Sequence, residues 1–325
     1  MSREVLCLRP LADFERAGAL PPGSLEVVYR SPDDADVPEL MKRASALMIP
    51  AVGPKLSQGL FENTKLRLVQ VTGAGLDRLD KGLLERLGIP LANVPGGSNG
   101  ALAEYAVTAA SVLLRRLAWA DAEIRAGNYR AFRARMVADN LPGLAGLLVG
   151  VVGLGTIGQA VAEAFHKMDC RICYYDPAPR DPTAAGMIGA SALDLKQLLA
   201  TADVVTLHVP FLPETQGLIG ASQLAAMKPG AVLIQASRGG VVDEVALAQS
   251  LKSGHLGGAA VDVYPSEPPP GDNPLFSLEG EAARRLLFTP HIAGVTRQSA
   301  TFLFRSAWQN VERVLIQNQA PRNCV

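Results

Sequence analysis

Short apolar runs recur along the chain, and the segments between them show the three- and four-residue spacing of apolar positions that is typical of helices. The first hundred residues contain five such runs, at residues 4–8, 25–29, 45–49, 66–71 and 89–94. The runs are continuous rather than alternating, as in strands that are buried on both faces of a parallel sheet. This part of the chain therefore predicts an α/β unit in which helices cover a parallel sheet.

A second series of the same kind follows a long helical pattern at residues 101–126, which Gly127 breaks. The runs of this series lie at residues 146–153, 170–176, 203–209, 231–237, 257–263 and 285–289. A last helical pattern covers residues 296–317, and we expect this helix to return to the first unit. The whole pattern predicts an α/β protein of two doubly wound parallel-sheet domains, with a cleft between them for a ligand.

The composition narrows the range of partners. At 325 residues, of which 48% are hydrophobic, the chain is long enough for two domains and more than one core. Its 31 Lys and Arg residues balance 31 Asp and Glu residues, so no net field favours nucleic acid or an anionic membrane. The first residues lack the apolar core of a signal peptide, and no apolar run approaches the roughly 18 residues of a membrane span. We therefore expect a cytoplasmic protein whose partners are small molecules and copies of itself.

Two of the four cysteines, Cys170 and Cys173, form a C-x-x-C pattern. They lie in an apolar run that predicts a buried strand, where residues three apart face opposite sides. Redox-active pairs lie at helix N-termini instead. We therefore interpret both cysteines as unreactive core residues, and we expect no metal site in the chain.

The run at residues 146–153 leads into the sequence GLGTIG, which has the pattern G-x-G-x-x-G between a predicted strand and a predicted helix. In this context Gly153 permits a tight turn, Gly155 lets the backbone approach a pyrophosphate, and Gly158 allows the helix to pack closely on the strand. A glycine turn without a ligand is the alternative. The position of the pattern predicts a Rossmann-type, dinucleotide-binding domain in the second half of the chain.

The next predicted strand ends in Asp176, 18 residues after Gly158 (176 − 158). An acid at about this separation accepts hydrogen bonds from the hydroxyls of the adenosine ribose. The same carboxylate repels a 2′-phosphate, and we therefore expect NAD as the cofactor, with NADP less favoured. Arg180 lies four residues further on and leaves binding of a 2′-phosphate open.

Three chemically active side chains, Arg238, Glu267 and His291, follow the last three predicted strands. Ligands of doubly wound sheets gather at the carboxyl ends of the strands, so we expect these side chains near one site. Taken singly, they have plainer interpretations as a turn residue, a surface acid and a loop residue. Together they suit hydride transfer to a 2-oxo acid. A guanidinium forms two parallel hydrogen bonds with the substrate carboxylate. An imidazole donates the proton. A carboxylate side chain beside the imidazole fixes its tautomer and favours its charged form.

Distinctive motifs extend over nearly the whole chain: TGAGLDRLD, NVPGGSNGALAEYA, GLGTIG with YYD, LHVPFLPETQGLI, MKPGAVLIQASRGGVVDE, GGAAVDVYPSEPP and TPHIAG. With these motifs the sequence resembles the D-isomer-specific 2-hydroxyacid dehydrogenases, a family that includes glyoxylate and hydroxypyruvate reductases, D-lactate dehydrogenases and phosphoglycerate dehydrogenases. The resemblance implies a flavodoxin-like substrate-binding domain of residues 1–99 and 293–325, and a Rossmann NAD-binding domain of residues 100–292. It also implies an oxidoreductase that moves a hydride between nicotinamide and a small 2-oxo acid or D-2-hydroxy acid.

The resemblance assigns roles to individual residues. It implies that Arg238 binds the substrate, that Glu267 pairs with His291, and that His291 is the acid/base. It also implies that the backbone amides of Ala74 and Gly75 help to hold the substrate carboxylate. The residues implied near the cofactor are Gly153, Gly155, Thr156, Ile157, Gly158, Asp176, His208, Pro210, Ala236, Ser237, Asp262 and Gly294.

Details of the motifs refine this expectation. Gln235 stands where family members more often have Asn, at the end of a predicted strand. The loop before Asp77 offers no basic residue, which favours a substrate without a phosphate, although Lys55 or Arg78 could point inward. The sequence ends at Val325, and we expect no regulatory domain of the kind that follows in the longer phosphoglycerate enzymes.

The segment at residues 101–143 is too long and too mixed in character for a simple linker. In the family that the chain resembles, the corresponding segment forms an arm that packs around the partner subunit, so the resemblance implies a homodimer. An arm that folds back on its own domain is the alternative.

Two other functions stay open. A protein of this fold could sense NAD(H) and bind other proteins, as the transcriptional co-repressors of the family do. Oxidation of formate or phosphite is the second alternative. The formate enzymes pair the histidine with a glutamine, so Glu267 disfavours formate.

Overall fold

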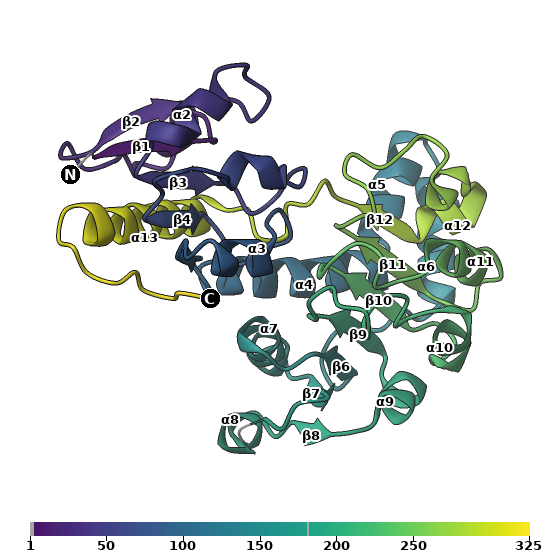
Figure 1. Ribbon diagram of the computed structural model, residues 1–325. Helices are drawn as coiled ribbons and strands as arrows, with labels where there is room; N and C mark the ends of the chain where they lie inside the picture. The colour runs from purple at the N-terminus through teal and green to yellow at the C-terminus, as the bar shows by residue number, and fades with distance from the viewer. Residues whose placement is uncertain (1–2, 181) are drawn as a thin grey trace. The chain divides into compact units, whose positions relative to one another are not determined.

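The computed structural model describes residues 3–180 and 182–325 (Figure 1). The chain divides into two compact units, of which the first comprises Met1–Ser98 with Val295–Val325 and the second comprises Asn99–Gly294. Each unit contains its own parallel sheet. This arrangement confirms the predicted fold class of two parallel-sheet α/β domains.

The sheet of the first unit has five strands in the order β2-β1-β3-β4-β5. The strands are β1 (Glu4–Cys7), β2 (Glu26–Tyr29), β3 (Ala46–Ile49), β4 (Leu68–Val71) and β5 (Leu91–Ala92). The helices are α1 (Leu11–Arg16), α2 (Val37–Arg43), α3 (Lys81–Arg86), α13 (Arg297–Leu315) and the 3-10 helix η1 (Gln58–Phe61). Every residue of β3 and β4 is buried, because helices cover both faces of the sheet.

Two hydrophobic cores fill the two faces of this sheet. On one face Phe14 of α1 packs on Trp308 of α13, with ring centroids 5.2 Å apart. On the other face α2 and α3 bury Met41 and Leu84. Helix α13 therefore belongs to the core of the first unit, although the whole second unit precedes it in the chain.

The sheet of the second unit has seven parallel strands in the order β12-β11-β10-β9-β6-β7-β8. The strands are β6 (Leu148–Val152), β7 (Arg171–Tyr175), β8 (Ser191–Ala192), β9 (Val204–Leu207), β10 (Val232–Gln235), β11 (Gly258–Val261) and β12 (Leu286–Phe288). The order reverses between β6 and β9, and the loops that leave the two strands diverge there. Such a switch point at the carboxyl edge is where open parallel sheets bind ligands.

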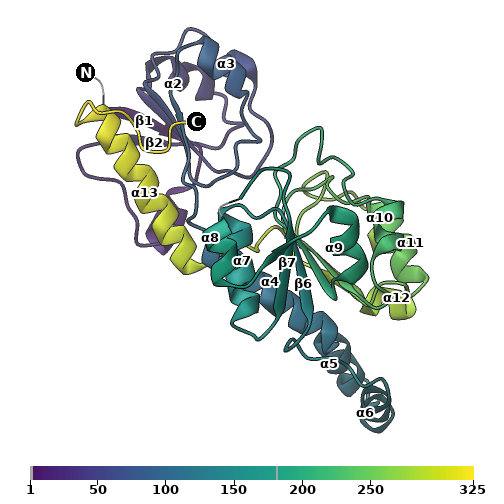
Figure 2. The same ribbon diagram turned by 90° about the horizontal axis from the view of Figure 1, so that it is seen from below.

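Helices cover both faces of the second sheet (Figure 2). Helices α4 (Asn99–Leu114) and α7 (Thr156–His166) share one core, which includes Ala106 and Phe165. Helices α9 (Leu195–Thr201), α10 (Ala221–Ala226) and α11 (Glu244–Lys252) share the other. The remaining helices are α5 (Leu117–Arg125), α6 (Tyr129–Ala138), α8 (Pro182–Met187), α12 (Gly280–Arg284) and the 3-10 helix η2 (Pro274–Ser277).

The prediction of one long helix at residues 101–126 was wrong in that the segment forms two helices. The structure breaks it into α4 and α5 at Arg116, whose backbone is left-handed with a φ of 51°. The Arg116 side chain pairs with Asp139, which follows α6, and stacks on Trp119 at 5.3 Å. The pair with Asp139 forms only when α5 and α6 fold against each other, so the helical spacing of the sequence did not indicate the break.

Candidate active site

The glycine loop between β6 and α7 is shaped by close packing of backbone on backbone. Gly153 has a φ of 92°, and a Cβ atom there would lie 2.6 Å from the carbonyl oxygen of His208. A Cβ atom on Gly158 would lie 1.9 Å from the carbonyl oxygen of Gly153. In contrast, a Cβ atom on Gly155 would have no neighbour within 4 Å. The loop is thus tight on the protein side and open above Gly155, which fits a pyrophosphate at the start of α7.

Asp176 follows β7, and its side chain is 3% exposed. Its carboxylate accepts hydrogen bonds from the backbone N–H groups of Leu154 (2.8 Å) and Ala178 (2.9 Å) and pairs with Arg180 at 2.7 Å. Burial of the carboxyl acts to raise its pKa, but the Arg180 guanidinium and the two N–H groups outweigh burial and hold the pKa below its usual range. The structure therefore places a fixed anion beside the glycine loop, and Arg180 is bound to it.

Asp262 follows β11 and holds the loop that carries His291. Its backbone carbonyl accepts a hydrogen bond from the N–H of His291 at 2.8 Å. Its carboxylate, on a residue only 1% exposed, accepts from the N–H groups of Ile292 (2.8 Å) and Ala293 (2.9 Å). His291 has a φ of 54°, a left-handed conformation that residues with a side chain seldom adopt. The hydrogen bonds to Asp262 hold the backbone in that conformation.

The imidazole of His291 contacts the carboxylate of Glu267. Nδ1 lies 2.9 Å from Oε1 and 2.8 Å from Oε2. The Glu267 carboxylate also accepts a hydrogen bond from the backbone N–H of Tyr264 at 3.2 Å, which fixes its position. A carboxylate only accepts hydrogen bonds, so Nδ1 carries the proton in this pair and Nε2 is left for a reactant. About a quarter of each of the two side chains is exposed, 27% and 28%.

Arg238 lies in the turn after β10, and the side chain of Gln235 holds this turn. Nε2 of Gln235 donates to the carbonyl oxygen of Arg238 at 2.9 Å, and its Oε1 accepts from the hydroxyl of Ser237 at 2.8 Å. Gly239 is required in the turn because a Cβ atom there would lie 1.9 Å from the carbonyl oxygen of Tyr264. Sequence reasoning placed Gln235 in the strand and missed this contact. A polar amide in an otherwise apolar run was the signal in the sequence that could have found it.

His208 follows β9, directly beside the glycine loop. Its Nε2 lies 2.8 Å from the hydroxyl oxygen of Thr206. Its Nδ1 is buried and has no hydrogen-bond partner among the described residues. Burial lowers the pKa of His208 to about 4. The side chain is therefore a neutral imidazole at physiological pH.

The other residues predicted near the cofactor lie along the same edge of the second sheet. Ala236 packs in a small apolar cluster with Ala293 and Leu102, and Ile157 borders this cluster. Leu102 joins this cluster from α4, a contact that depends on how α4 crosses the strands and that no spacing in the sequence indicates. Thr156 begins α7 after Gly155, Ser237 follows Ala236, Pro210 follows β9 by three residues, and Gly294 ends the second unit.

Ala74 and Gly75 belong to the first unit, in the loop after β4. The side-chain amide of Asn93 donates to the carbonyl oxygen of Ala74 at 2.8 Å and holds this loop. The placement of Ala74 and Gly75 at the substrate stays a prediction.

Arg78 of the first unit is buried, and its side chain binds the backbone of a neighbouring loop. It is 3% exposed, and its guanidinium donates to the carbonyl oxygens of Pro54 (2.8 Å) and Pro50 (3.2 Å). Burial lowers its pKa from the usual range of arginine. A guanidinium that is committed to backbone carbonyls in this way is not disposed to bind a phosphate.

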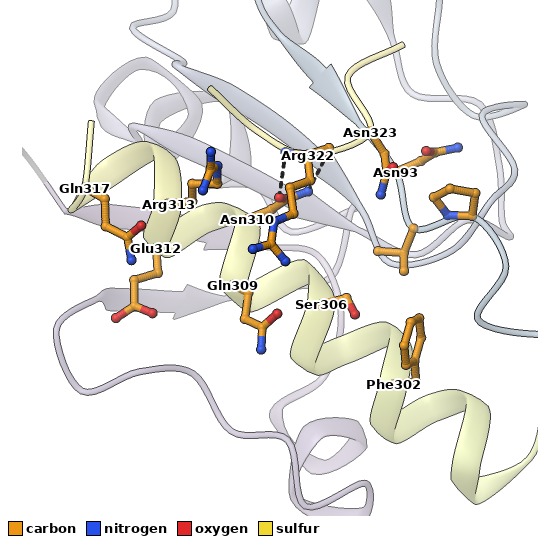
Figure 3. A pocket seen from close by; sticks show the side chains of 12 residues that line it. Asn93, Phe302, Ser306, Gln309, Asn310, Glu312, Arg313, Gln317, Arg322 and Asn323 are labelled. Atoms are coloured by element: carbon orange, nitrogen blue, oxygen red, sulfur yellow. Dashed lines mark hydrogen bonds between the residues drawn. The ribbon is translucent and has the colours of Figure 1, made fainter. Parts of the chain in front are cut away.

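A hollow of about 280 Å³ lies in the first unit between α13 and the C-terminal segment (Figure 3). Asn310, which is 3% exposed, joins the two. Its Nδ2 donates to the carbonyl oxygen of Arg322 and its Oδ1 accepts from the Arg322 N–H, each at 2.9 Å. The polar side chains around Asn310 therefore tie the C-terminal segment to α13.

These features define a protein with two parallel-sheet units, the second of which has a dinucleotide-binding loop. Residues 107–293 match the family model described as "D-isomer specific 2-hydroxyacid dehydrogenase, NAD binding domain". The chain belongs to this family, as its motifs predicted, and the second unit is an NAD-binding domain. In the described part of the chain, none of the helices combines the length and the apolar character that a membrane span requires.

Individual relatives agree with this assignment. The chain is 37% identical to a D-3-phosphoglycerate dehydrogenase of Archaeoglobus fulgidus over 72% of its own length and 42% of the relative's length. It is 35% identical to a glyoxylate reductase of Thermococcus litoralis, over 80% of this chain and 77% of the relative. The crystal structure of the TT0316 protein from Thermus thermophilus is 30% identical, with a TM-score of 0.83 and 99% of both chains covered. The chain thus spans less than half the length of the phosphoglycerate relative.

Proposed function

We propose that the protein is an NAD-dependent oxidoreductase that interconverts a small 2-oxo acid and its D-2-hydroxy acid. The observation that carries the proposal is the hydrogen bond from Nδ1 of His291 to both oxygens of Glu267, at 2.9 and 2.8 Å, in the unit that has the NAD-binding loop. The dehydrogenase and reductase names of the relatives support this choice of reaction.

His291 acts as the acid/base in this proposal. Because Glu267 binds Nδ1, a proton on Nε2 can pass to the substrate oxygen during reduction, and Nε2 takes the proton back during oxidation. The carboxylate holds the ring through Nδ1 and so fixes the direction in which Nε2 points. NAD, when bound, supplies or accepts the hydride. The proton and the hydride together convert the carbonyl to the secondary alcohol.

Arg238 binds the substrate carboxylate in this proposal. A planar guanidinium forms two parallel hydrogen bonds with a carboxylate and so fixes its orientation. Gln235 keeps the turn of Arg238 in place through its bond to the Arg238 carbonyl.

We further propose that the substrate carries no phosphate. The candidate bases were Lys55 and Arg78, and Arg78 is occupied by the carbonyl oxygens of Pro50 and Pro54. Of these two bases only the exposed Lys55 is left for a phosphate, so we favour glyoxylate, hydroxypyruvate and pyruvate over a phosphorylated acid. We also propose that the enzyme acts in the cytoplasm.

The arm formed by α5 and α6 supports a homodimer. Its own small core joins Trp119 and Phe132, whose ring centroids lie 5.5 Å apart. Apolar side chains on the arm remain exposed, namely Leu117, Ile124, Tyr129 and Val137, the last at 66%. A second copy of the chain would cover these side chains, and we propose the homodimer as the working form.

NADH consumption tests the proposed reaction. The wild-type chain is expected to oxidise NADH with at least one of glyoxylate, hydroxypyruvate and pyruvate. His291→Ala should lower turnover by roughly two to four orders of magnitude, the usual contribution of a positioned acid or base, with little change in NADH binding. Glu267→Gln keeps the size of the side chain and loses its charge, so it should lower turnover as well.

The matched control is His166→Ala, because His166 is exposed at the end of α7. This variant should keep the wild-type rate. Near wild-type turnover in His291→Ala, or no NADH consumption with any of the three acids, would contradict the proposed function.

A further inference from the structure

A chain of hydroxyl groups connects helix α4 to the loop of His291. The Tyr105 hydroxyl lies 2.7 Å from Oγ1 of Thr289. Oγ1 of Thr289 donates to Oδ1 of Asp262 at 2.5 Å. A threonine hydroxyl has one hydrogen, and it is already given to the carboxylate. The Tyr105 hydroxyl must therefore be the donor to Thr289, and the chain runs from phenol to hydroxyl to carboxylate.

The end of this chain is the carboxylate that fixes the backbone of His291. Oδ1 of Asp262 accepts from the N–H of Ile292, and Oδ2 accepts from the N–H of Ala293. These bonds hold His291 at a φ of 54°. A left-handed backbone at a residue with a side chain persists only where its surroundings impose it. A change at Asp262 is therefore transmitted directly to the orientation of the imidazole.

Thr289 is also held from a second side. The Tyr264 hydroxyl lies 3.0 Å from the carbonyl oxygen of Thr289 and 3.2 Å from that of Val261, and its one hydrogen is shared between these two acceptors. Burial raises the pKa of Tyr264 and of Tyr105 to about 12, so both phenols keep their hydrogens at any working pH. Thr289, two positions before His291, is thus bound at its side chain by Tyr105 and at its backbone by Tyr264.

We infer that Tyr105 is a positioning residue for His291 and acts through the hydroxyl of Thr289 and the carboxylate of Asp262. This inference rests on the proposed role of His291 as the acid/base. Loss of the Tyr105 hydroxyl leaves an acceptor site on Thr289 empty and weakens the polarised bond from Thr289 to Asp262. The imidazole then leaves its reactive position for part of the time. Small displacements of a reacting group lower the rate of the chemical step more than the binding of ligands.

The test uses the full-length protein and removes each hydroxyl separately. Tyr105→Phe is expected to lower kcat about 10-fold, and Thr289→Val about 10- to 100-fold, with the NADH dissociation constant changed less than about twofold. Thr289→Ser retains the hydroxyl and should restore most of the rate. Because Tyr105 acts through Thr289, Tyr105→Phe should have little further effect in the Thr289→Val background.

A second readout does not need turnover. The chain has four histidines, so the ring proton signals in an NMR spectrum can be assigned with His291→Ala. The His291 signal should shift in Tyr105→Phe and in Thr289→Val, while the signal of His166 stays in place. The matched control is Tyr29→Phe, which removes a buried tyrosine hydroxyl of the first unit that has no hydrogen-bond partner among the described residues. This control should leave both the His291 signal and kcat unchanged.

The outcomes separate this inference from the proposed function. If His291→Ala abolishes turnover while Tyr105→Phe changes neither kcat nor the His291 signal, the inference is wrong and the proposed function stands. If His291→Ala retains turnover, the proposed function fails, and so does the catalytic meaning of the inference. A loss of thermal stability in Tyr105→Phe without a change in the His291 signal would show a purely structural role and would also overturn it.

Discussion

The neutral state of His208 predicts how the stability of the protein depends on pH. The unfolded chain protonates this side chain below a pH of about 6.5. In the folded protein its pKa lies at about 4, because burial disfavours the imidazolium. A proton on the buried Nδ1 would have no acceptor among the described residues. Between these two pH values the unfolded state therefore binds more protons than the folded state.

The size of the effect follows from this difference. Lowering the pKa from 6.5 to about 4 corresponds to about 3 kcal/mol of unfolding free energy. This contribution is complete above pH 6.5 and is lost as the pH falls toward 4. About 2.5 kcal/mol of it should already be lost at pH 4.5. His208→Gln keeps a polar side chain next to Thr206 and cannot titrate, so its unfolding free energy should lack this dependence.

Urea unfolding followed by circular dichroism at pH values from 4.5 to 7.5 measures the effect as the difference between wild type and variant. The wild-type chain should lose stability on acidification more steeply than His208→Gln, by about 2.5 kcal/mol over this range. The control His166→Gln changes an exposed histidine and should follow the wild-type curve. Parallel curves for wild type and His208→Gln would refute the reasoning, because they would show that the two states bind the proton at His208 equally well.

Two other predictions concern the cofactor and the assembly. Asp176→Ala removes the anion that holds Arg180, so the ratio of kcat/KM with NADH to that with NADPH should fall at least about 10-fold. A wild-type enzyme that uses NADPH as well as NADH would contradict the assignment. Val137→Glu places a charge on the exposed face of α6, so light scattering should show a shift from twice 34.3 kDa toward 34.3 kDa. The matched Val245→Glu on α11, also an exposed valine, should stay dimeric, and a wild-type monomer at micromolar concentration would overturn the homodimer.

Much of the fold was predictable because the information is local in the sequence. Continuous apolar runs indicated the strands, since both faces of each parallel sheet are covered by helices. The glycine pattern indicated its own turn, because the absence of a Cβ atom at Gly153 and Gly158 is what the packing requires. The apolar run at residues 89–94 indicated β5, whereas β8 has only two residues, which are exposed and give no pattern of their own.

The sequence alone determined which chemically active residues follow which strands, and hence that Arg238, Glu267 and His291 lie along one edge of the second sheet. Only the tertiary structure decided how they are held. Tyr105 and Thr289 are 184 positions apart, and no local spacing indicates that their hydroxyls meet. The direction of a side chain depends on how its helix crosses the sheet and on which backbone groups lie in reach. For that reason the structure was needed to find the hydrogen bonds that position the imidazole.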